Sequence, residues 1–340
     1  MSATAPAKLR LMRESEGVLP NTLALAYVVC GSLGGFALMA ATPWWANAAG
    51  ALLSAHAMLI AAYLIHEAAH YTLFARAEHN RLAGELMSFI AGGAYVSFER
   101  IRHLHLRHHR DRADVTCFDY KAFLRKRPLL RRLVYSLEWA HLPAVETLMH
   151  LQVIFRPLLV QSQRCYLPRT ITMLVLRAAL LGAVAWFSLK AVLLYFVAYG
   201  LLLATLDFFD AFHHTFDQYF TDADANVPLG GRDRNYEQEN TYSNVVSARH
   251  PWLNLLTLNF GYHNAHHERA SVPWYRLPAL HRELFGDSKR ELMSVREVLR
   301  SFHRNRLKRV LDDDYGSVGE GLTRADGYVG AHGVSFLTVV

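Results

Sequence analysis

The sequence has little cysteine and little charge. Its three cysteines, Cys30, Cys117 and Cys165, stand far apart with no paired spacing, which excludes a disulfide framework, a thiolate zinc site and an iron–sulfur site. Charged residues make up 19% of the 340 residues, below the roughly 25% of soluble domains, whereas hydrophobic residues make up 52%. The N-terminal part has no short apolar core followed by a small-residue cleavage site, so we do not expect a secretory signal.

The apolar residues collect in long runs that are almost free of charge. Each run approaches the roughly 20 residues that a helix needs to cross a bilayer, although Arg177 interrupts the third. We therefore predict an all-α membrane protein with four transmembrane helices and a cytoplasmic helical cap. The predicted spans cover about residues 22–41, 46–65, 171–187 and 191–209, with a turn at 188–190 between the last two.

The positive charge is distributed unevenly between the predicted loops. With a cytoplasmic N-terminus, the two outer loops carry only Lys190, and nearly all other lysines and arginines face the cytoplasm, as the positive-inside rule requires. The net charge of +7 is compatible with nucleic-acid binding. Because the basic residues flank apolar runs, anionic membrane lipid is the better partner, and we expect no nucleic acid.

Three histidine clusters stand between and after the predicted spans, and a further pair, His213 and His214, follows the fourth span. Spacings of i, i+3 and i+4 place side chains on one face of a helix. The four-span topology puts every cluster on the cytoplasmic side, whereas a three-span alternative would separate them. The clusters are His66 and His70; His105, His108 and His109; and His263, His266 and His267.

This many imidazoles exceeds what one metal ion needs. Imidazole suits iron, zinc and copper, and one zinc takes about four ligands. Eight or nine clustered histidines without cysteine suit two metal ions, and we favour iron that activates oxygen. Neutral ligands leave two irons strongly positive, which favours attack on an unactivated C–H bond; this step is a hypothesis.

The clusters have the form of three motifs: His66-Glu-Ala-Ala-His70, His105-Leu-Arg-His108-His109 and His263-Asn-Ala-His266-His267. In this order, with pairs of spans between them, they resemble the three histidine boxes of the integral-membrane fatty acid desaturase and hydroxylase superfamily. The flanks of the last motif, Leu256–His263 and Val272–His281, are also similar. The resemblance covers roughly residues 20–300.

The resemblance implies a di-iron site at the cytoplasmic end of the bundle. His214 joins the ligands because the family places a histidine directly before threonine after the fourth span; His213, or His103 beside the second box, remains an alternative. Glu67, Asp207 and Asp210 are candidates to orient ligands. The implied metal ligands are His66, His70, His105, His108, His109, His214, His263, His266 and His267.

The resemblance also implies an activity: a desaturase that uses O2 to introduce a double bond into a fatty acyl lipid or acyl thioester. There is no His-Pro-Gly-Gly motif of a fused cytochrome b5 domain, so we expect a separate electron donor of ferredoxin or cytochrome b5 type. We expect a multi-pass protein of a bacterial cytoplasmic membrane rather than of the endoplasmic reticulum, with its active site facing the cytoplasm.

Two alternatives remain open at this point. A hydroxylase, ketolase or acetylenase would use the same site with a different outcome at the substrate carbon. A membrane metal transporter would also use histidine clusters, but along a path through the spans. In either case we expect a cytoplasmic tail at residues 1–21, a single membrane domain at 22–310 and a loosely held tail at 311–340.

Overall fold

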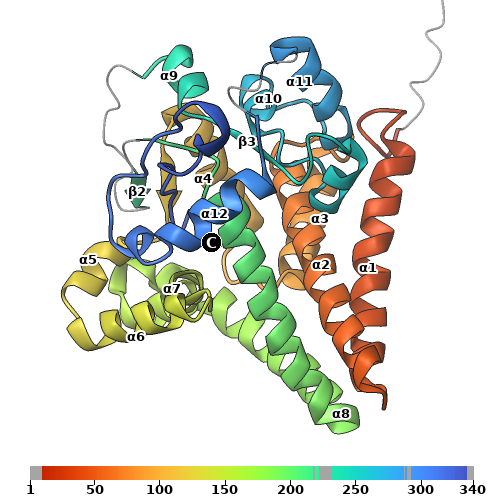
Figure 1. The fold of residues 1–340 in the computed structure, drawn as a ribbon. Coiled ribbons are helices and arrows are strands. Elements are labelled where there is room, and N and C mark those ends of the chain that lie inside the picture. Colours follow the sequence, from red (N-terminus) through yellow and green to blue (C-terminus); the bar gives the residue numbers. More distant parts are fainter. Residues whose placement is uncertain (1–9, 217–218, 222–231, 287, 289–291, 335–340) are drawn as a thin grey trace, which may run out of the picture.

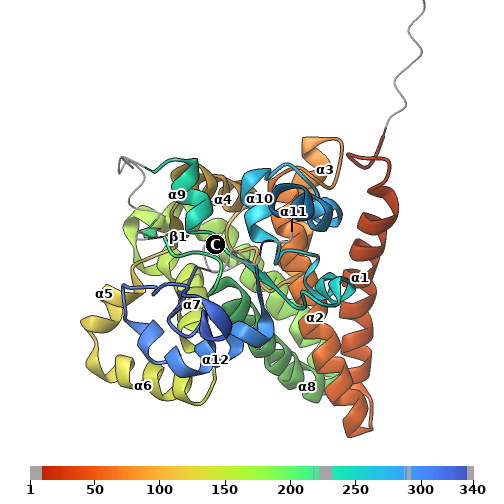
Figure 2. The same ribbon diagram turned by 45° about the horizontal axis from the view of Figure 1, so that its top comes forward.

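The computed structural model describes residues 10–216, 219–221, 232–286, 288 and 292–334. Long helices form one end of the molecule, and shorter helices and loops cap the other (Figures 1 and 2). Within the described residues, three-residue strands form two parallel pairs, β1 (Asp114–Thr116) with β2 (Tyr219–Thr221) and β3 (Ser243–Val245) with β4 (Leu292–Ser294). The helices are α1 (Val18–Ala40), α2 (Trp44–Ala69), α3 (Ala77–Ile90), α4 (Phe98–Asp111), α5 (Tyr120–Arg125), α6 (Pro128–Trp139), α7 (Ala144–Leu159), α8 (Leu167–Asp210), α9 (Arg234–Glu239), α10 (His263–Glu268), α11 (Leu277–Phe285) and α12 (Val295–Asn305).

The long helices have the length and composition of membrane spans. In the described part of the chain, three helical stretches are long and apolar enough to cross a membrane: α1, α2 and Gln161–Asp210, which contains α8. Large apolar side chains such as Leu33, Trp44 and Trp186 are exposed on them, which marks surfaces that face lipid rather than water. The protein is thus a mostly helical membrane protein, as predicted.

Small residues let α1 and α2 pack closely against each other. A Cβ atom on Gly50 would lie 2.7 Å from the carbonyl oxygen of Gly35, so the two backbones meet there with no side chain between them. At the turn, the side-chain amide of Asn47 donates to three carbonyl groups at the end of α1, at 2.8–3.1 Å, and so helps to satisfy the last carbonyls of the helix. These contacts fix the direction of α2, whose far end carries His66.

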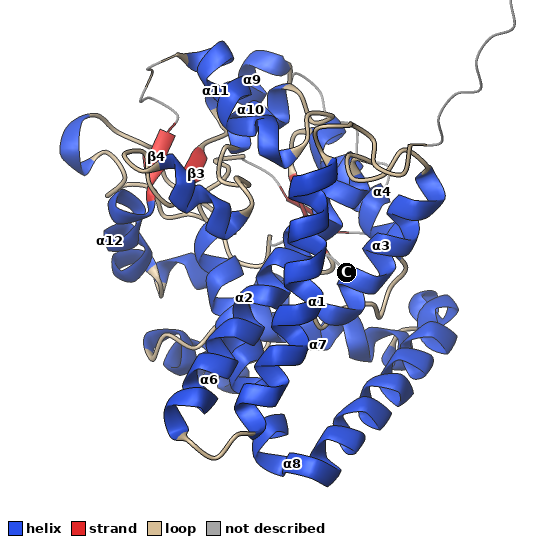
Figure 3. Cartoon of the chain, turned by 90° about the vertical axis from the view of Figure 1, so that its right-hand side faces the viewer, coloured by secondary structure: helices blue, strands red, loops and turns tan. Residues whose placement is uncertain are grey.

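Helix α8 doubles back on itself at its lower end (Figures 1 and 3). The backbone leaves helical geometry at Ser188, where φ is −158° and ψ is 96°. The Ser188 hydroxyl oxygen accepts from the backbone N–H three residues later at 3.2 Å and so caps the second half. Lys190 Nζ donates to Asn47 Oδ1 at 3.1 Å, which ties this bend to the α1–α2 turn. We call residues 167–187 and 189–210 the first and second legs of α8.

The loop after α10 ties the cap to the long helices. The indole Nε1 of Trp274 donates to Asn21 Oδ1 at 2.9 Å, and its backbone N–H donates to Glu67 Oε2 at 3.1 Å. All three side chains are buried, so these hydrogen bonds satisfy groups that would otherwise be costly to bury. The third histidine motif is thereby held against α1 and α2.

The described part of the C-terminal segment is packed rather than loosely held, in contrast to our expectation for residues 311–340. Tyr328 is fully buried. His332 Nδ1 lies 2.6 Å from Asp207 Oδ1, and its Nε2 lies 3.9 Å from Glu138 Oε2. The segment supplies a partner for a buried carboxylate of α8, which neither composition nor periodicity indicates. Residues 335–340 lie outside the described residues.

This region predicts a pH-dependent stability. Glu146 of α7 is buried, its Oε1 accepts from the backbone N–H of Gly333 at 2.6 Å, and burial, together with nearby Asp207, raises the pKa of its carboxyl well above 4.5. The folded chain therefore keeps a proton that the unfolded chain releases, so this group lowers stability as the pH rises from about 4.5 through the folded-state pKa.

Glu146→Gln keeps a side-chain oxygen that can accept from the backbone N–H of Gly333, but removes the ionisable carboxyl group. We expect its melting temperature to exceed that of the parent at pH 8, with the difference shrinking toward pH 5. Thermal unfolding of the detergent-purified proteins at both pH values measures this. Exposed Glu239→Gln is the control, and equal melting temperatures of Glu146→Gln and parent at pH 8 would contradict the prediction.

Candidate metal centre

The first histidine pair lies at the upper end of α2. His66 is in the last turn and is 2% exposed, and His70 is the residue at which the helix ends. Glu67 lies between them, with Oε1 3.5 Å from His66 Nδ1 and Oε2 accepting from the Thr72 hydroxyl at 2.6 Å. Glu67 therefore contacts His66 at a distance too long for a strong hydrogen bond, while its other oxygen is held by Thr72.

The second cluster lies on one face of α4. The i, i+3, i+4 spacing of His105, His108 and His109 turns all three rings toward α2 and α10, where they contact histidines of both helices. The helix begins at Phe98, which is fully buried, and this anchor sets the rotation of α4. His103, by contrast, is exposed.

The third cluster lies on α10, a helix of six residues that begins at His263. The chain reaches it through Leu258 and Asn259, both with positive φ, and through Gly261, where a Cβ atom would lie 2.3 Å from the carbonyl oxygen of Asn244. The tight fit of Gly261 against the backbone of β3 holds α10 over the site.

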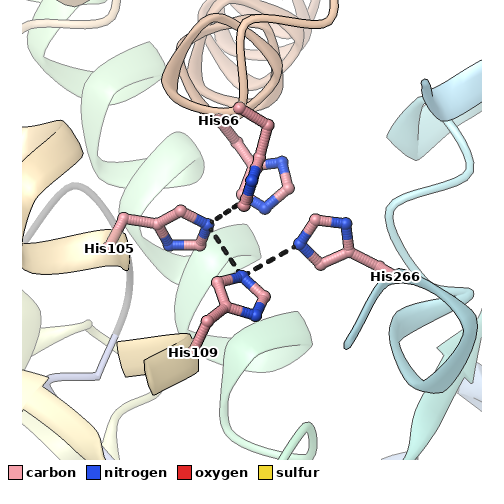
Figure 4. Close-up of side chains that lie close together, drawn as sticks. His66, His105, His109 and His266 are labelled. Carbon is pink, nitrogen blue, oxygen red and sulfur yellow. Dashed lines mark hydrogen bonds between the residues drawn. The ribbon is translucent and has the colours of Figure 1, made fainter. Parts of the chain in front are cut away.

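The structure brings all nine predicted residues together in two adjoining groups. The ring nitrogens of each group lie within 4.8 Å of one another, close enough to hold a metal ion. Figure 4 shows four rings of the first group, from α2, α4 and α10, directed toward a common point. The first group is His66, His70, His105, His109 and His266, and the second is His108, His214, His263 and His267.

The separations of the ring nitrogens fit a metal ion better than hydrogen bonds between the rings. In the first group, the Nε2 atom of His105 lies 2.7 Å from that of His70 and 3.2 Å from that of His109, which in turn lies 3.1 Å from that of His266. Ligand nitrogens about 2.1 Å from one metal, at right angles, are about 3 Å apart. A neutral imidazole Nε2 has either one hydrogen or one lone pair, so this chain of contacts cannot consist of hydrogen bonds alone. A shared cation would satisfy every lone pair.

The second group has the same geometry. The Nε2 atom of His263 lies 2.9 Å from that of His214 and 3.1 Å from that of His267, which lies 3.3 Å from that of His108. The rings of His109 and His267 are 4.3 Å apart between centroids, so the two groups are in direct contact. The donor set therefore fits two neighbouring metal ions.

Burial keeps the rings outside the long helices uncharged. It lowers the pKa of His108 to about 4, and burial followed by the repulsion of neighbouring histidines lowers the pKa of His109, His266 and His267 well below 6.5. At neutral pH these imidazoles are neutral, which is the state that coordinates metals.

Several Nδ1 atoms are held by groups outside the clusters, which turns the Nε2 atoms inward. His108 Nδ1 donates to the Ala113 carbonyl at 2.8 Å, and His267 Nδ1 donates to Glu237 Oε1 at 2.8 Å. Arg112 Nε donates to the other oxygen of Glu237 at 3.1 Å. Such contacts fix the tautomer and ring orientation of a metal-binding histidine.

Sequence reasoning missed Glu237, because nothing in its local sequence distinguishes it from exposed Glu239 two residues later. We expect Glu237→Ala to weaken iron binding by roughly 10–100-fold, the usual cost of losing a group that orients a ligand. Titration of the apoprotein with Fe(II) measures this, and Glu239→Ala is the matched control. Equal affinities of Glu237→Ala and parent would show that His267 needs no carboxylate partner.

The residues considered as alternatives or helpers lie beside the two groups. His213 is buried and stacks on His263, with ring centroids 4.1 Å apart, and its Nδ1 lies 3.6 Å from Asp210. Neither His213 nor exposed His103 belongs to either of the two histidine groups described above. Asp207 contacts His332 instead of a predicted ligand.

A small cavity adjoins the histidines. Its volume is about 60 Å³, and its wall combines histidines, among them His66, His108 and His263, with the carboxylates of Asp114 and Asp210 and with apolar side chains. The apolar walls come from Ile101, Leu104, Val115, Phe260 and Val334. The cavity can hold a few small molecules beside the site where metal ions would bind.

Long apolar helices with nine converging imidazoles gathered at one end define a membrane protein whose histidine groups can bind metal. The fatty acid desaturase family matches residues 43–298, more than half of the chain, and the chain belongs to this family. The family implies an oxidoreductase that acts on a lipid or acyl substrate, as the histidine motifs predicted. No curated protein matches the chain.

Proposed function

We propose that this protein is a membrane-bound fatty acyl desaturase that holds two iron ions and uses O2 and an external reductant to introduce a double bond into an acyl chain. The contact between a group of five and a group of four histidines carries this proposal. Two adjoining sets of neutral imidazoles suit two redox-active metals better than one structural zinc, which takes about four ligands. The nine histidines of the two groups are the proposed ligands.

The overall reaction sets the demands on the site. The acyl chain loses two hydrogens, and O2 is reduced to two waters with two electrons and two protons from outside. Bound iron would supply oxygen activation and hydrogen abstraction from an unactivated C–H bond. The chain's own residues would hold the metal ions through neutral rings, and the apolar side chains in the wall of the adjoining cavity lie directly beside these rings.

We further propose a four-span topology with the site at the cytoplasmic face. The bend at Ser188 supports it, because each leg of α8 then has about the length of one span, and Lys190 places the bend beside the α1–α2 turn. The histidine groups lie at the other end of these helices, at the last turn of α2 and just beyond the last turn of α8. In this proposal one membrane domain covers residues 22–310, after a cytoplasmic tail at 1–21, in a bacterial cytoplasmic membrane.

The electron donor is proposed to be a separate acidic protein of ferredoxin or cytochrome b5 type. His70 and His109 are partly exposed, so the first group approaches the surface. Of the basic residues of α4, Arg102 stacks on Tyr71 at 4.1 Å, and Arg110 is 67% exposed and pairs with Asp111 at 2.7 Å. A positive rim near the metal ligands attracts an acidic partner.

Metal analysis and product analysis together test the proposed function. We expect about two irons per chain in the detergent-purified protein, and an acyl product that is two hydrogens lighter than the substrate when O2 and a reductant are supplied. A product heavier by one oxygen would assign a hydroxylase instead. Stoichiometric zinc without oxygen consumption would overturn the oxidoreductase assignment.

A further inference from the structure

A second cavity lies away from the histidines, between α7, residues 91–95 and the two legs of α8. Its volume is about 360 Å³, within the range of roughly 300–1,000 Å³ that is usual for small-ligand sites. It shares no lining residue with the cavity at the metal centre. Most of its wall is apolar, from Leu151, Ile154, Leu181, Phe196 and Leu203.

One arginine lies in this wall, together with the polar side chains of Thr147, His150 and three tyrosines. Arg177, on the first leg of α8, is half-buried and donates to the Tyr195 hydroxyl at 3.1 Å and to the carbonyls of Phe89 and Gly93 at 2.9 and 3.3 Å. Its guanidinium also lies over the rings of Phe89 and Tyr95. No carboxylate pairs with it among the described residues, and its Nε has no hydrogen-bond partner there.

Part of this arrangement is structural, because Arg177 caps carbonyl groups at the end of α3. A helix C-terminus carries only about half a negative charge, however, so the contacts leave much of the guanidinium charge uncompensated. A charged group in a membrane-spanning segment is costly and is usually paired. The unpaired cation beside an apolar cavity thus matches a ligand with one negative group and a hydrocarbon chain.

We propose that this cavity binds an anionic single-chain lipid, with the carboxylate of a fatty acid at Arg177 and its chain along the apolar wall. The volume suits one acyl chain rather than two. Arg177 also lies about two turns, or roughly 12 Å, beyond Arg169, which already pairs with Glu85. Arg169 thus has a carboxylate partner, whereas Arg177, deeper in the span, is the cation that remains for the carboxylate of a single-chain lipid.

Two glycines keep the cavity in shape. Gly92 has φ +95°, and a Cβ atom there would lie 2.2 Å from the Tyr199 ring, so this glycine allows Tyr199 to take its place in the wall. The Tyr199 hydroxyl is hydrogen-bonded to His150 Nε2 at 2.5 Å. Gly200 also lines the cavity, and a Cβ atom there meets nothing within 4 Å. A larger side chain at position 200 would fill the cavity without displacing the backbone.

Retention of labelled fatty acid by the full-length protein tests the proposal. The protein is placed in phosphatidylcholine nanodiscs, titrated with deuterated oleate and analysed by native mass spectrometry. We expect about one oleate per chain in the parent and at least about tenfold weaker binding in Gly200→Leu and in Arg177→Met. Gly182→Leu, on the same helix at a position equally open in the structure, is the control and should bind like the parent.

The outcomes separate binding of a fatty acid carboxylate from binding of an uncharged chain and from binding of a phospholipid. Undiminished oleate binding by Gly200→Leu would overturn it, even if Arg177→Met failed to fold. Equal binding of oleate methyl ester would show that the negative charge is not recognised, and displacement of oleate by phosphatidylglycerol would assign the site to a phospholipid phosphate. The binding measurement needs no iron and no turnover. The lipid-binding proposal therefore stands or fails independently of the proposed desaturase activity.

Discussion

Replacing His266 by alanine is expected to lower the iron content well below two per chain and to reduce turnover more than about 100-fold. Loss of a group that merely orients a metal ligand costs roughly 10–100-fold, and a ligand itself should cost more. His266 is 1% exposed, and its Nε2 lies 3.1 Å from that of His109. Its loss therefore opens the first histidine group at the side formed by α10. Iron analysis and oxygen consumption measure the two effects.

His103→Ala is the matched control, because His103 lies on the same helix as the second cluster but is exposed. We expect it to keep the iron and activity of the parent. If His103→Ala lost iron as fully as His266→Ala, the register of the second motif would need revision. If His266→Ala kept both irons and full activity, the proposed ligand set would be wrong.

Gly261→Ala is expected to damage the metal site strongly although residue 261 is not itself a proposed ligand. The new methyl group would lie 2.3 Å from the Asn244 carbonyl oxygen and 3.1 Å from the Val245 Cα atom, and neither backbone atom can move without shifting β3. Overpacking of this kind typically costs about 1–3 kcal/mol. Since α10 begins two residues later, the strain falls directly on His263, His266 and His267.

The expected result is a lower melting temperature together with a loss of bound iron. Gly182→Ala makes the same chemical change where a Cβ atom meets nothing within 4 Å, and alanine favours a helix over glycine. We expect this control to melt at or above the parent temperature with unchanged iron. A normal iron content in Gly261→Ala would mean that β3 does not position α10.

The local sequence was sufficient for the parts of the protein that depend on neighbouring residues. Helical spacing predicted which histidines share a face of α4, and the short helix α10 presents its three histidines as expected. The uncharged runs predicted the long helices, since span length and composition are local properties. The bend of α8 falls at Ser188, within the predicted turn at residues 188–190.

Long-range contacts decided what local sequence could not. Glu237 reaches His267 from a separate helix, and no spacing rule connects the two. The segment around His332 looked like a tail because its glycines have no period, yet it closes over Asp207 across 125 positions. The uncompensated charge of Arg177 likewise became visible only once α3, α7 and the two legs of α8 were placed together.

The sequence by itself determined the type of donor, the number of histidines and the helices that carry them, because these follow from residue chemistry and helical periodicity. Only the tertiary structure decided how the histidines divide into a group of five and a group of four. His109 and His266 lie 157 positions apart, and His108 and His267 lie 159 apart. Such pairings are set by how α4 and α10 pack over the end of α2, and this packing depends on side chains throughout the chain.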